Sequence, residues 1–560
     1  MTKILEPFGS QLKWDVGGAS PQSEGALAMP LVGEEMACEP ATVNASAVVA
    51  RAIEEVSERA QTNRGVLPLV ERLCEMLSAE QISFCHWKSN WKLERWLTGE
   101  GDLDLLVERK DAERFLAVVS RLGFKQALPT PDRDVPAVLN YYGFDSSAGK
   151  FLHLHVHFQL VLGHDLTKNF RLSIERAYLE SADAQRLMPT PAPEFELITF
   201  VLRMVLKYSA TETLLRRAFT KRGASSGSSL RRELEYLEAR ADRAELHATL
   251  SEHLPFIDSA FFDACADSLR AGASAFERLR VRRGLKRRLS AQGRRSNPSD
   301  ALTMSGRRIA RFVREGIFKK SSRKRLAKGG AVVALVGGDG AGKTTCVEEL
   351  HSWLSKKFVT RKFHMGRPPR SPLTLGVIVL LRLRRLLTAK RETEVQKHET
   401  DAQGHPPQQS KPFPGYIQLL RWVCAARDRH RLYRKLRRFA GAGGIAICDR
   451  YLVPQISLMD GPNIARSIEP SRMNGLVRLM LRAETDYYSR IMPADLLVVL
   501  RVEPEIAVRR KTDEAESHVR TRSRELWEID WSDTHARVVD AGRPVGEVVA
   551  RLKSLVWSEL

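Results

Sequence analysis

Residues 333 to 350 read VALVGGDGAGKTTCVEEL and decide the fold of the C-terminal part of this 560-residue chain. The stretch fits the phosphate-loop pattern G-x-x-x-x-G-K-[ST] through Gly337, Gly342, Lys343 and Thr344. An apolar run precedes the loop and a helical pattern follows it, which is the context that the motif requires. Glycines let successive backbone N–H groups face one concavity, where the helix N-terminus adds partial positive charge. The stretch therefore predicts a P-loop α/β domain that binds nucleotide phosphates.

The loop and the strands around it supply the candidate site residues. We expect the loop to hold ATP through Gly337, Gly338, Asp339, Gly340, Ala341, Gly342, Lys343, Thr344 and Thr345. Lys343 would reach the outer phosphates, and the Thr344 hydroxyl a magnesium ion. Asp449 and Arg450 follow a predicted strand, and ligands of parallel α/β sheets bind beyond the carboxyl ends of strands. Asp449 would hold magnesium and Arg450 a phosphate, although an ordinary strand-end ion pair is the alternative.

A second basic cluster, RRKTDEAESHVRTRSRE, covers residues 509 to 525. Phosphoryl transfer depends on positioning and on stabilising charge that spreads over the moving phosphoryl oxygens. We therefore expect a lid here with Arg520 and Arg522 as catalytic candidates; a solvated helix face is the alternative.

Four segments in order resemble thymidylate kinases and related nucleoside monophosphate kinases: LVGGDGAGKTT, AICDRY, ADLLVVLRVEPEIAVRRK and VVDAGRPVGEVVARL. The similarity covers roughly residues 331 to 560. It implies that Asp339 approaches the acceptor nucleotide, that Asp449 and Arg450 form the D-R motif, and that the last segment closes the adenine side. Val336 stands where the family usually has glutamate, and VPQISLMDGPN replaces the A-Y-Q segment that follows D-R-Y.

The N-terminal part contains a second pattern in CHWKSNWKLERWLTGEGDLDLLV, residues 85 to 107. Asp102 and Asp104 lie two apart on a predicted strand, so both carboxylates point to one face. Lys88 and Ser89 precede them at the end of another predicted strand. The pattern resembles the nucleotidyltransferase fold, which implies that the two aspartates bind magnesium and nucleotide phosphates. A surface strand with paired acids is the alternative.

A third carboxylate is normal in such enzymes, but the candidate strand here reads HLHVHFQL, with His153, His155 and His157 on one face. Three interpretations stay open. The module is a degenerate nucleotide- or substrate-binding domain, an active transferase that recruits Asp145 or Asp165, or a site for a softer metal held by the histidines. Half-buried structural histidines remain an alternative for any one of them.

The net charge of +22 is concentrated between Arg278 and Lys328, where 19 Lys and Arg residues stand against two acids, a balance of 19 − 2 = +17. Ile309, Phe312, Val313 and Ile317 follow a helical spacing within this segment. Three interpretations compete: a solvated linker, a helix that packs on its own domains, and an anchor for a membrane surface or other polyanion. None of them requires specific nucleic-acid recognition.

The predicted organisation is that of an α/β multidomain chain. Its parts are a flexible lead-in (1–60), the nucleotidyltransferase-like α/β module (61–190), a helical region (191–278), the basic linker with its amphipathic helix (279–330), and the P-loop kinase domain with a parallel sheet flanked by helices (331–560), which carries a mobile insertion at about 392–415. The N-terminal residues lack a basic start followed by an apolar core, and the longest apolar run, Leu373 to Leu381, is too short for a membrane span, so we expect a cytoplasmic protein.

The leading functional interpretation is ATP- and magnesium-dependent phosphorylation of a nucleoside monophosphate, with dTMP first. The alternatives are a P-loop kinase for another small acceptor selected by the N-terminal module, and an ATP-binding regulatory or scaffold protein at an anionic surface. The sequence predicts no oligomeric state.

Overall fold

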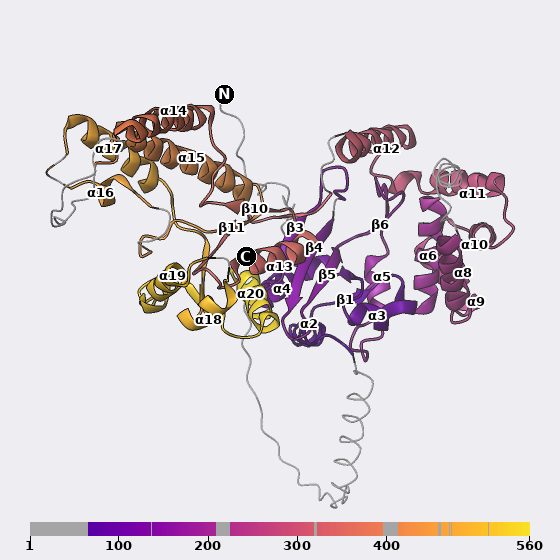
Figure 1. Cartoon of the computed structure of the whole chain (residues 1–560). Coiled ribbons are helices and arrows are strands. Elements are labelled where there is room, and N and C mark those ends of the chain that lie inside the picture. The colour runs from indigo at the N-terminus through magenta and orange to yellow at the C-terminus, as the bar shows by residue number, and fades with distance from the viewer. Residues whose placement is uncertain are drawn as a thin grey trace, which may run out of the picture. The chain divides into compact units, whose positions relative to one another are not determined.

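The computed structural model describes residues 65–135, 137–208, 224–317, 322–395, 413–456, 461–469, 471, 473–512 and 514–560, which belong to one unit (Figure 1). The lead-in predicted at 1–60 and most of the insertion predicted at 392–415 lie outside these residues.

The C-terminal part is built on a five-stranded parallel sheet. Its order is β10-β11-β9-β12-β13, so the strand that carries the phosphate loop, β9, is central. The strands are β9 (Val332–Gly337), β10 (Thr360–His364), β11 (Ile445–Asp449), β12 (Leu496–Arg501) and β13 (Arg537–Asp540). Because parallel strands need crossover connections, helices alternate with them along the chain. The parallel α/β fold predicted for this part is confirmed.

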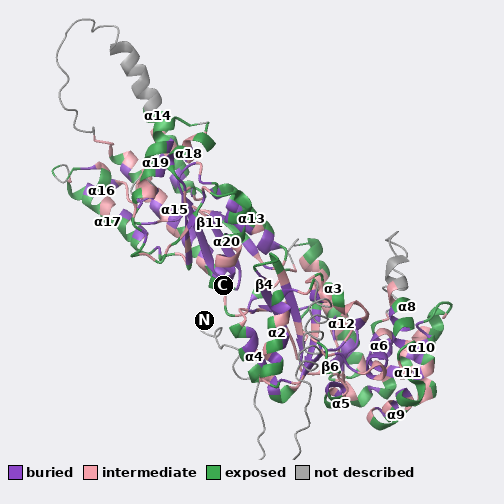
Figure 2. Ribbon diagram, turned by 90° about the horizontal axis from the view of Figure 1, so that it is seen from below, coloured by how far each residue is buried: buried purple, intermediate pink, exposed green. Residues whose placement is uncertain are grey.

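Both faces of this sheet are buried, as the purple strands of Figure 2 show. Val333 and Leu335 pack against one layer of helices, and Val332 and Ala334 against the other. The first layer is α13 (Lys343–Ser355) and α20 (Val545–Glu559); the second includes α15 (Tyr416–Gly441), α17 (Gly475–Ser489) and α19 (Glu516–Glu528). The remaining helices of this part are α14 (Pro372–Val395), α16 (Ile464–Ser467) and α18 (Pro504–Arg510). Continuous Val, Ile and Leu runs in the strands follow from this two-sided burial.

Helix α14 contains the longest apolar run of the sequence and leaves part of that run exposed, at Leu373, Leu375, Val379 and Leu380. No helix among the described residues combines the length and the apolar character that a membrane span requires.

The N-terminal part is built on a mixed six-stranded sheet of order β1-β2-β5-β4-β3-β8. Its strands are β1 (Phe84–His86), β2 (Asp102–Val107), β3 (Lys125–Leu128), β4 (Val138–Asp145), β5 (Lys150–His157) and β8 (Arg325–Leu326). Leu103 and Leu105 of β2 face a core formed with α2 (Pro68–Ala79) and α4 (Ala112–Arg121). Since side chains alternate along a strand, Asp102 and Asp104 lie on the opposite face.

A helical region follows this sheet along the chain. It consists of α6 (Pro193–Lys207), α8 (Ala224–Glu238), α9 (Arg243–His253), α10 (Ser259–Asp267) and α11 (Ala275–Arg288). Its core includes Leu106 of β2 and Trp87, which directly follows β1. Helix α5 (Glu175–Glu180) and the hairpin β6 (Leu160–Leu162) and β7 (Phe170–Leu172) contribute to the same core. The short 3₁₀ helices η1 (Asn90–Lys92), η2 (Arg109–Asp111) and η3 (Ser290–Gln292) and the five-residue helix α3 (Leu93–Leu97) complete this part.

The basic segment is more structured than a linker. After α11 it forms α12 (Asn297–Phe312), a π-helical turn (Val313–Ile317) and then β8. Arg307 donates to the carbonyl oxygens of Asp134 and Leu166, and Arg314 donates to the buried Asp132. These contacts favour the second interpretation, a helix that packs on its own domains. The apolar side chains Leu302, Ile309, Phe312 and Ile317 are exposed.

The two sheets share one hydrophobic core. Leu326 of β8 and Tyr142 of β4 belong to the same buried cluster as β9 and α13. The ring of Phe151 stacks on Trp353 with centroids 4.8 Å apart, and the indole of Trp557 donates to the Gly123 carbonyl at 3.2 Å. The N-terminal sheet and the P-loop part therefore fold against each other, through contacts that no motif predicts.

Candidate functional site

The phosphate loop joins β9 to α13, where its glycines allow close packing. A Cβ atom on Gly338 would lie 2.7 Å from the Ser523 hydroxyl, and one on Gly340 would lie 2.6 Å from the Ala507 carbonyl oxygen. Both Gly340 and Gly342 have φ near +80°, a left-handed conformation that favours glycine. The glycines of the motif thus let α18 and α19 pack directly on the loop.

Asp339 lies at the centre of a cationic cluster. Its carboxylate accepts a hydrogen bond from Arg522 at 2.7 Å and lies 3.8 Å from Arg450 and 4.0 Å from Lys343. Burial raises the pKa of Asp339, but the bond from Arg522 and the charges of Lys343 and Arg450 outweigh this effect and lower it. Lys343 Nζ also donates to the Gly338 carbonyl at 2.7 Å. Three cations therefore converge on the loop, in a place suited to a larger anion.

Asp449 ends β11 beside the loop strand, opposite Leu335 of β9. Its Oδ1 atom is buried and has no hydrogen-bond partner among the described residues. An unpartnered carboxylate oxygen is costly unless something binds it. Arg450 follows with φ +62°, and its backbone N–H donates to the Leu335 carbonyl at 3.1 Å. This turn holds the D-R pair at the carboxyl edge of the sheet.

The structure brings most, but not all, of the predicted residues together. Lys343, Asp449, Arg450 and Arg522 lie around the loop. Thr344 and Thr345 are exposed in the first turn of α13. Arg520 is exposed on α19, and no contact described for it reaches the loop.

The segment from His364 to Arg370 also lies beside this site, and the sequence patterns above did not predict it. His364 of β10 pairs with Asp449, and the Met365 N–H donates to the Asp449 carbonyl at 3.2 Å. The following HMGRPPR run places the exposed Arg367 and Arg370 after the same strand. Two arginines directly after a parallel strand could have indicated this segment, because ligands bind beyond the carboxyl ends of such strands.

A cleft of about 940 Å³ lies at the open side of β13. Its lining includes Asp540, Gly542 and Arg543, from the segment that the family resemblance assigns to the adenine side. Arg501 lies over the Trp527 ring, with its guanidinium 4.3 Å from the ring centroid, at the same cleft.

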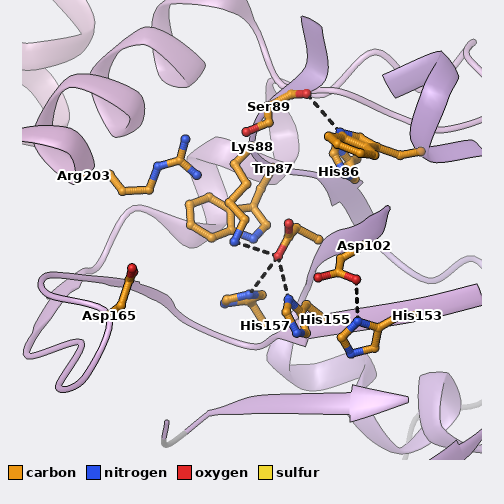
Figure 3. A network of polar contacts seen from close by, with 12 residues as sticks. His86, Trp87, Lys88, Ser89, Asp102, His153, His155, His157, Asp165 and Arg203 are labelled. Carbon is orange, nitrogen blue, oxygen red and sulfur yellow. Dashed lines mark hydrogen bonds and ion pairs between the residues drawn. The ribbon is translucent and has the colours of Figure 1, made fainter. Parts of the chain in front are cut away.

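The second predicted pair, Asp102 and Asp104, lies among cations and histidines, and Figure 3 shows Asp102 beside His153 and His155. Asp104 accepts from Lys88 at 2.7 Å and lies 3.3 Å from His155 Nδ1 and 3.7 Å from His157 Nε2. Burial raises the pKa of Asp104, but the Lys88 charge and the two histidines hold it well below its usual value. Lys88 is fixed by the following turn, where Glu196 accepts from the Asn90 N–H at 3.1 Å.

Asp102 is more exposed and binds His153, whose Nδ1 lies 2.6 Å from its carboxylate. On the other side of the ring, His153 Nε2 lies 3.2 Å from Asn140 Oδ1 and 3.0 Å from Lys324 Nζ. Burial lowers the pKa of His153 to about 4, although Asp102 opposes that shift. The imidazole is therefore neutral near pH 7.

Neither acid considered as a third carboxylate joins this pair. Asp145 is occupied in the β4–β5 turn, where it accepts from the backbone of Leu69, Ser147 and Ala148. Asp165 is paired with Lys168 at 3.5 Å and Lys207 at 2.9 Å. The described contacts thus offer no third carboxylate for a magnesium site of the nucleotidyltransferase kind.

No known family model matches the chain. The chain is similar to the uncharacterized ATP-binding protein YghR of Escherichia coli K12, at 24% identity over 238 residues, which is 40% of this chain and 86% of YghR. YghR of the Escherichia coli O6:H1 strain CFT073 matches to the same extent. Among solved structures, thymidylate kinase from Candida albicans covers 41% of this chain and 91% of its own, at 16% identity and a TM-score of 0.25. The chain thus has distant curated relatives that carry the description ATP-binding, and these relatives are themselves uncharacterized.

Proposed function

We propose that the C-terminal part is an ATP-dependent kinase that phosphorylates a nucleoside monophosphate, with dTMP the first acceptor to test. The observation that carries the proposal is the convergence of Lys343, Arg450 and Arg522 on a P-loop at the carboxyl edge of a parallel sheet. Ligands of such sheets bind at this edge.

The roles follow from the chemistry of phosphoryl transfer, in which most of the catalysis is positioning and charge stabilisation. Lys343, now bound to a carbonyl of its own loop, would donate to the outer phosphates of ATP, which are stronger acceptors. Arg450 and Arg522 would neutralise charge on the transferred phosphoryl group. The Asp339 carboxylate, which contacts Arg450 and Arg522, would approach the acceptor.

Magnesium fits this site. Asp449 Oδ1 is a buried carboxylate oxygen without a partner among the described residues, and Thr344 lies in the first turn of α13, so the chain offers two hard oxygen ligands. A magnesium ion held by these residues would supply positive charge that offsets the charge of the ATP phosphates. Asp449 and Thr344 would orient it.

The acceptor is the finer part of the proposal. The resemblance of AICDRY and VVDAGRPVGEVV to thymidylate kinases favours dTMP, whereas the substituted segment after Tyr451 favours a different acceptor. Arg367 and Arg370, which follow β10, offer positive charge for the acceptor's phosphate. The proposal therefore includes a phosphate-bearing acceptor in either case.

The test is a coupled assay of ADP release by the full chain with ATP and magnesium, with each nucleoside monophosphate supplied separately. We expect acceptor-dependent turnover, and a loss of at least about 100-fold in the Lys343→Ala variant, because a P-loop lysine contacts the transferred charge. Lys356→Ala, an exposed lysine at the end of the same helix, is the matched control and should retain activity.

Three outcomes separate the alternatives. Turnover with dTMP alone supports the thymidylate assignment, and turnover with another phosphorylated acceptor supports a kinase of different specificity. ATP binding without turnover for any acceptor, together with unchanged ATP binding in Lys343→Ala, would contradict the kinase and favour a regulatory protein.

A further inference from the structure

We propose that Asp102, His153 and His155 form a binding site for a divalent first-row transition metal, such as zinc, in the N-terminal part. One candidate ligand atom from each of the three residues lies within 4.8 Å of the others. Two imidazole nitrogens and one carboxylate oxygen form a donor set that suits zinc, iron(II), cobalt and nickel. The inference does not depend on the kinase activity.

His155 is already oriented as a metal ligand. Its Nδ1 atom lies 3.3 Å from the Asp104 carboxylate, so in the tautomer that donates this hydrogen bond the Nε2 lone pair is free to bind a metal. Histidine ligands commonly donate their other ring N–H to a carboxylate, which fixes the ring and raises its basicity. Lys88 holds that carboxylate from the other side at 2.7 Å. Asp104 therefore orients His155 and does not bind the metal itself. The proposed site does not include a magnesium ion bound by Asp104.

His153 can exchange a proton for a metal ion. In one tautomer, Nδ1–H donates to Asp102 at 2.6 Å, and Nε2 accepts from Lys324 at 3.0 Å. In the other tautomer, Nε2–H donates to Asn140 Oδ1, which lies 3.2 Å away, and the Nδ1 lone pair faces Asp102. The metal would take the place of the proton between His153 and Asp102, as metal binding at histidine generally displaces protons.

Solvent can reach the proposed metal site from one side, because its three side chains differ in exposure. The Asp102 side chain is 46% exposed and that of His155 is 27% exposed, whereas His153 is buried. Zinc–ligand distances of about 2.1 Å require the three donors to approach one another slightly, which side-chain rotation of the two exposed residues provides. Solvent or a substrate oxygen can supply a fourth ligand from the open side, the arrangement of catalytic rather than structural zinc sites.

The experiment measures binding of Zn²⁺ alone to the metal-stripped full chain, without ATP, by calorimetry and by the visible absorption of Co²⁺. We expect each chain to bind one equivalent of Zn²⁺, and bound Co²⁺ to show a visible spectrum typical of a low coordination number. His155→Ala and Asp102→Ala should each lower the affinity for Zn²⁺ by more than about 100-fold. Even residues that only hold a metal ligand by a hydrogen bond contribute about 10- to 100-fold to metal affinity. His535→Ala removes an exposed histidine elsewhere and should leave the affinity unchanged.

Circular dichroism checks that the variants are folded, and His155→Gln and Asp102→Asn replace any variant that is not. Equal Zn²⁺ binding by wild type and these variants, or no Zn²⁺ binding by wild type, would overturn the site. Binding of Mg²⁺ in preference to Zn²⁺ would also overturn it, because it would show a hard carboxylate site.

A second variant tests the assigned tautomer. Lys324→Met removes the cation that now binds His153 Nε2 and frees that nitrogen to donate to Asn140. Zn²⁺ affinity should rise by about tenfold, which is the lower end of an outer-partner effect. An unchanged or weaker affinity would show that the metal-free hydrogen bonds are not those that metal binding exchanges.

Discussion

At the scale of single residues, the lid arginines illustrate how a helix selects one of several similar side chains. Arg520 and Arg522 are two positions apart on α19, so they point in different directions from the helix axis. Arg522 reaches Asp339, and its pKa is raised first by the hydrogen bond to that carboxylate. Arg520 is left exposed. The composition of the segment indicated an arginine at the phosphates, whereas the packing of α19 on Gly338 determines which one.

Arg522→Ala should therefore reduce kcat by at least about 100-fold, because a guanidinium at the transferred phosphoryl group contributes about 10³ or more in related chemistry. Arg520→Ala, its matched control, should stay within a factor of about three of wild type, in line with the small effects of exposed charges. Steady-state kinetics with the identified acceptor measures both. A larger effect of Arg520→Ala than of Arg522→Ala would mean that α19 rotates when nucleotide binds, so that Arg520 faces the phosphate loop.

The histidine strand predicts a pH dependence of stability. Burial lowers the pKa of His157 to about 4, although Asp104 opposes the shift. The unfolded chain, with a histidine pKa near 6.5, therefore binds a proton below about pH 6.5 that the folded chain does not bind until about pH 4. The free energy of unfolding should fall as the pH decreases through this window. Urea unfolding of metal-free protein at several pH values measures this fall. The free energy of unfolding should fall less steeply with pH in His157→Gln than in wild type, and as steeply as in wild type in His535→Gln.

At the scale of elements, helix α12 is held to the N-terminal part by charge. Asp132 is buried, and both Arg311 and Arg314 approach it. Burial raises the pKa of Asp132, but the hydrogen bond and charge of Arg314, together with further hydrogen bonds, lower it. The positive charge that marks this segment in the sequence is thus partly directed inward.

Asp132→Asn should lower the free energy of unfolding by about 2 kcal/mol, the usual contribution of a hydrogen bond between charged groups. It should also speed amide exchange across α12, because the helix loses an attachment. Glu315→Gln, at a partly exposed partner of the same Arg314, should cost less than about 1 kcal/mol. Equal amide exchange in α12 for the two variants would contradict the assignment.

The elements that the sequence predicted are those whose signals are local. The P-loop motif, the apolar run before it and the D-R pair at the end of β11 depend on a few adjacent residues, and the structure places them together. Strand β2 covers the predicted DLDLLV run without change. Strand β4 was missed, although its aromatic run VLNYYGFD ends at an SSAG turn and carries a hairpin signal.

Other features could not be read from local sequence. Strand β8 is only two residues long within a basic run, and it exists because β3 offers it a partner. The contact of Lys324 with His153 joins residues 171 positions apart. Such pairings depend on tertiary packing, which local propensity does not encode.

At the scale of the whole molecule, the buried aromatic cluster joins the two sheets. Phe151 contributes from the N-terminal sheet, and Trp353 and Trp557 contribute from helices of the P-loop part. Since interiors are closely packed, a cavity on one side of this cluster affects its partners on the other side.

Trp557→Ala should lower the free energy of unfolding by about 3–5 kcal/mol, the usual loss for a large buried aromatic residue. Hydrogen exchange should increase in β3 and β4, more than 400 residues earlier in the chain, as well as in α20. Trp91→Ala, at a partly exposed indole of the N-terminal part, is the control and should leave β13 and α20 unchanged. Faster exchange confined to the P-loop part would contradict a shared core.

Strand β8 has a consequence for how such a chain can be inherited. It lies just before the P-loop strand β9, yet it completes the sheet of the other half. A recombination event between residues 327 and 331 would give the P-loop part to a new gene but leave behind β8, which lies just before it in the chain. An event upstream of residue 324 would carry away the last strand of the N-terminal sheet and the lysine that contacts His153. Where the two halves are inherited together, substitutions along their common core should therefore be correlated through descent.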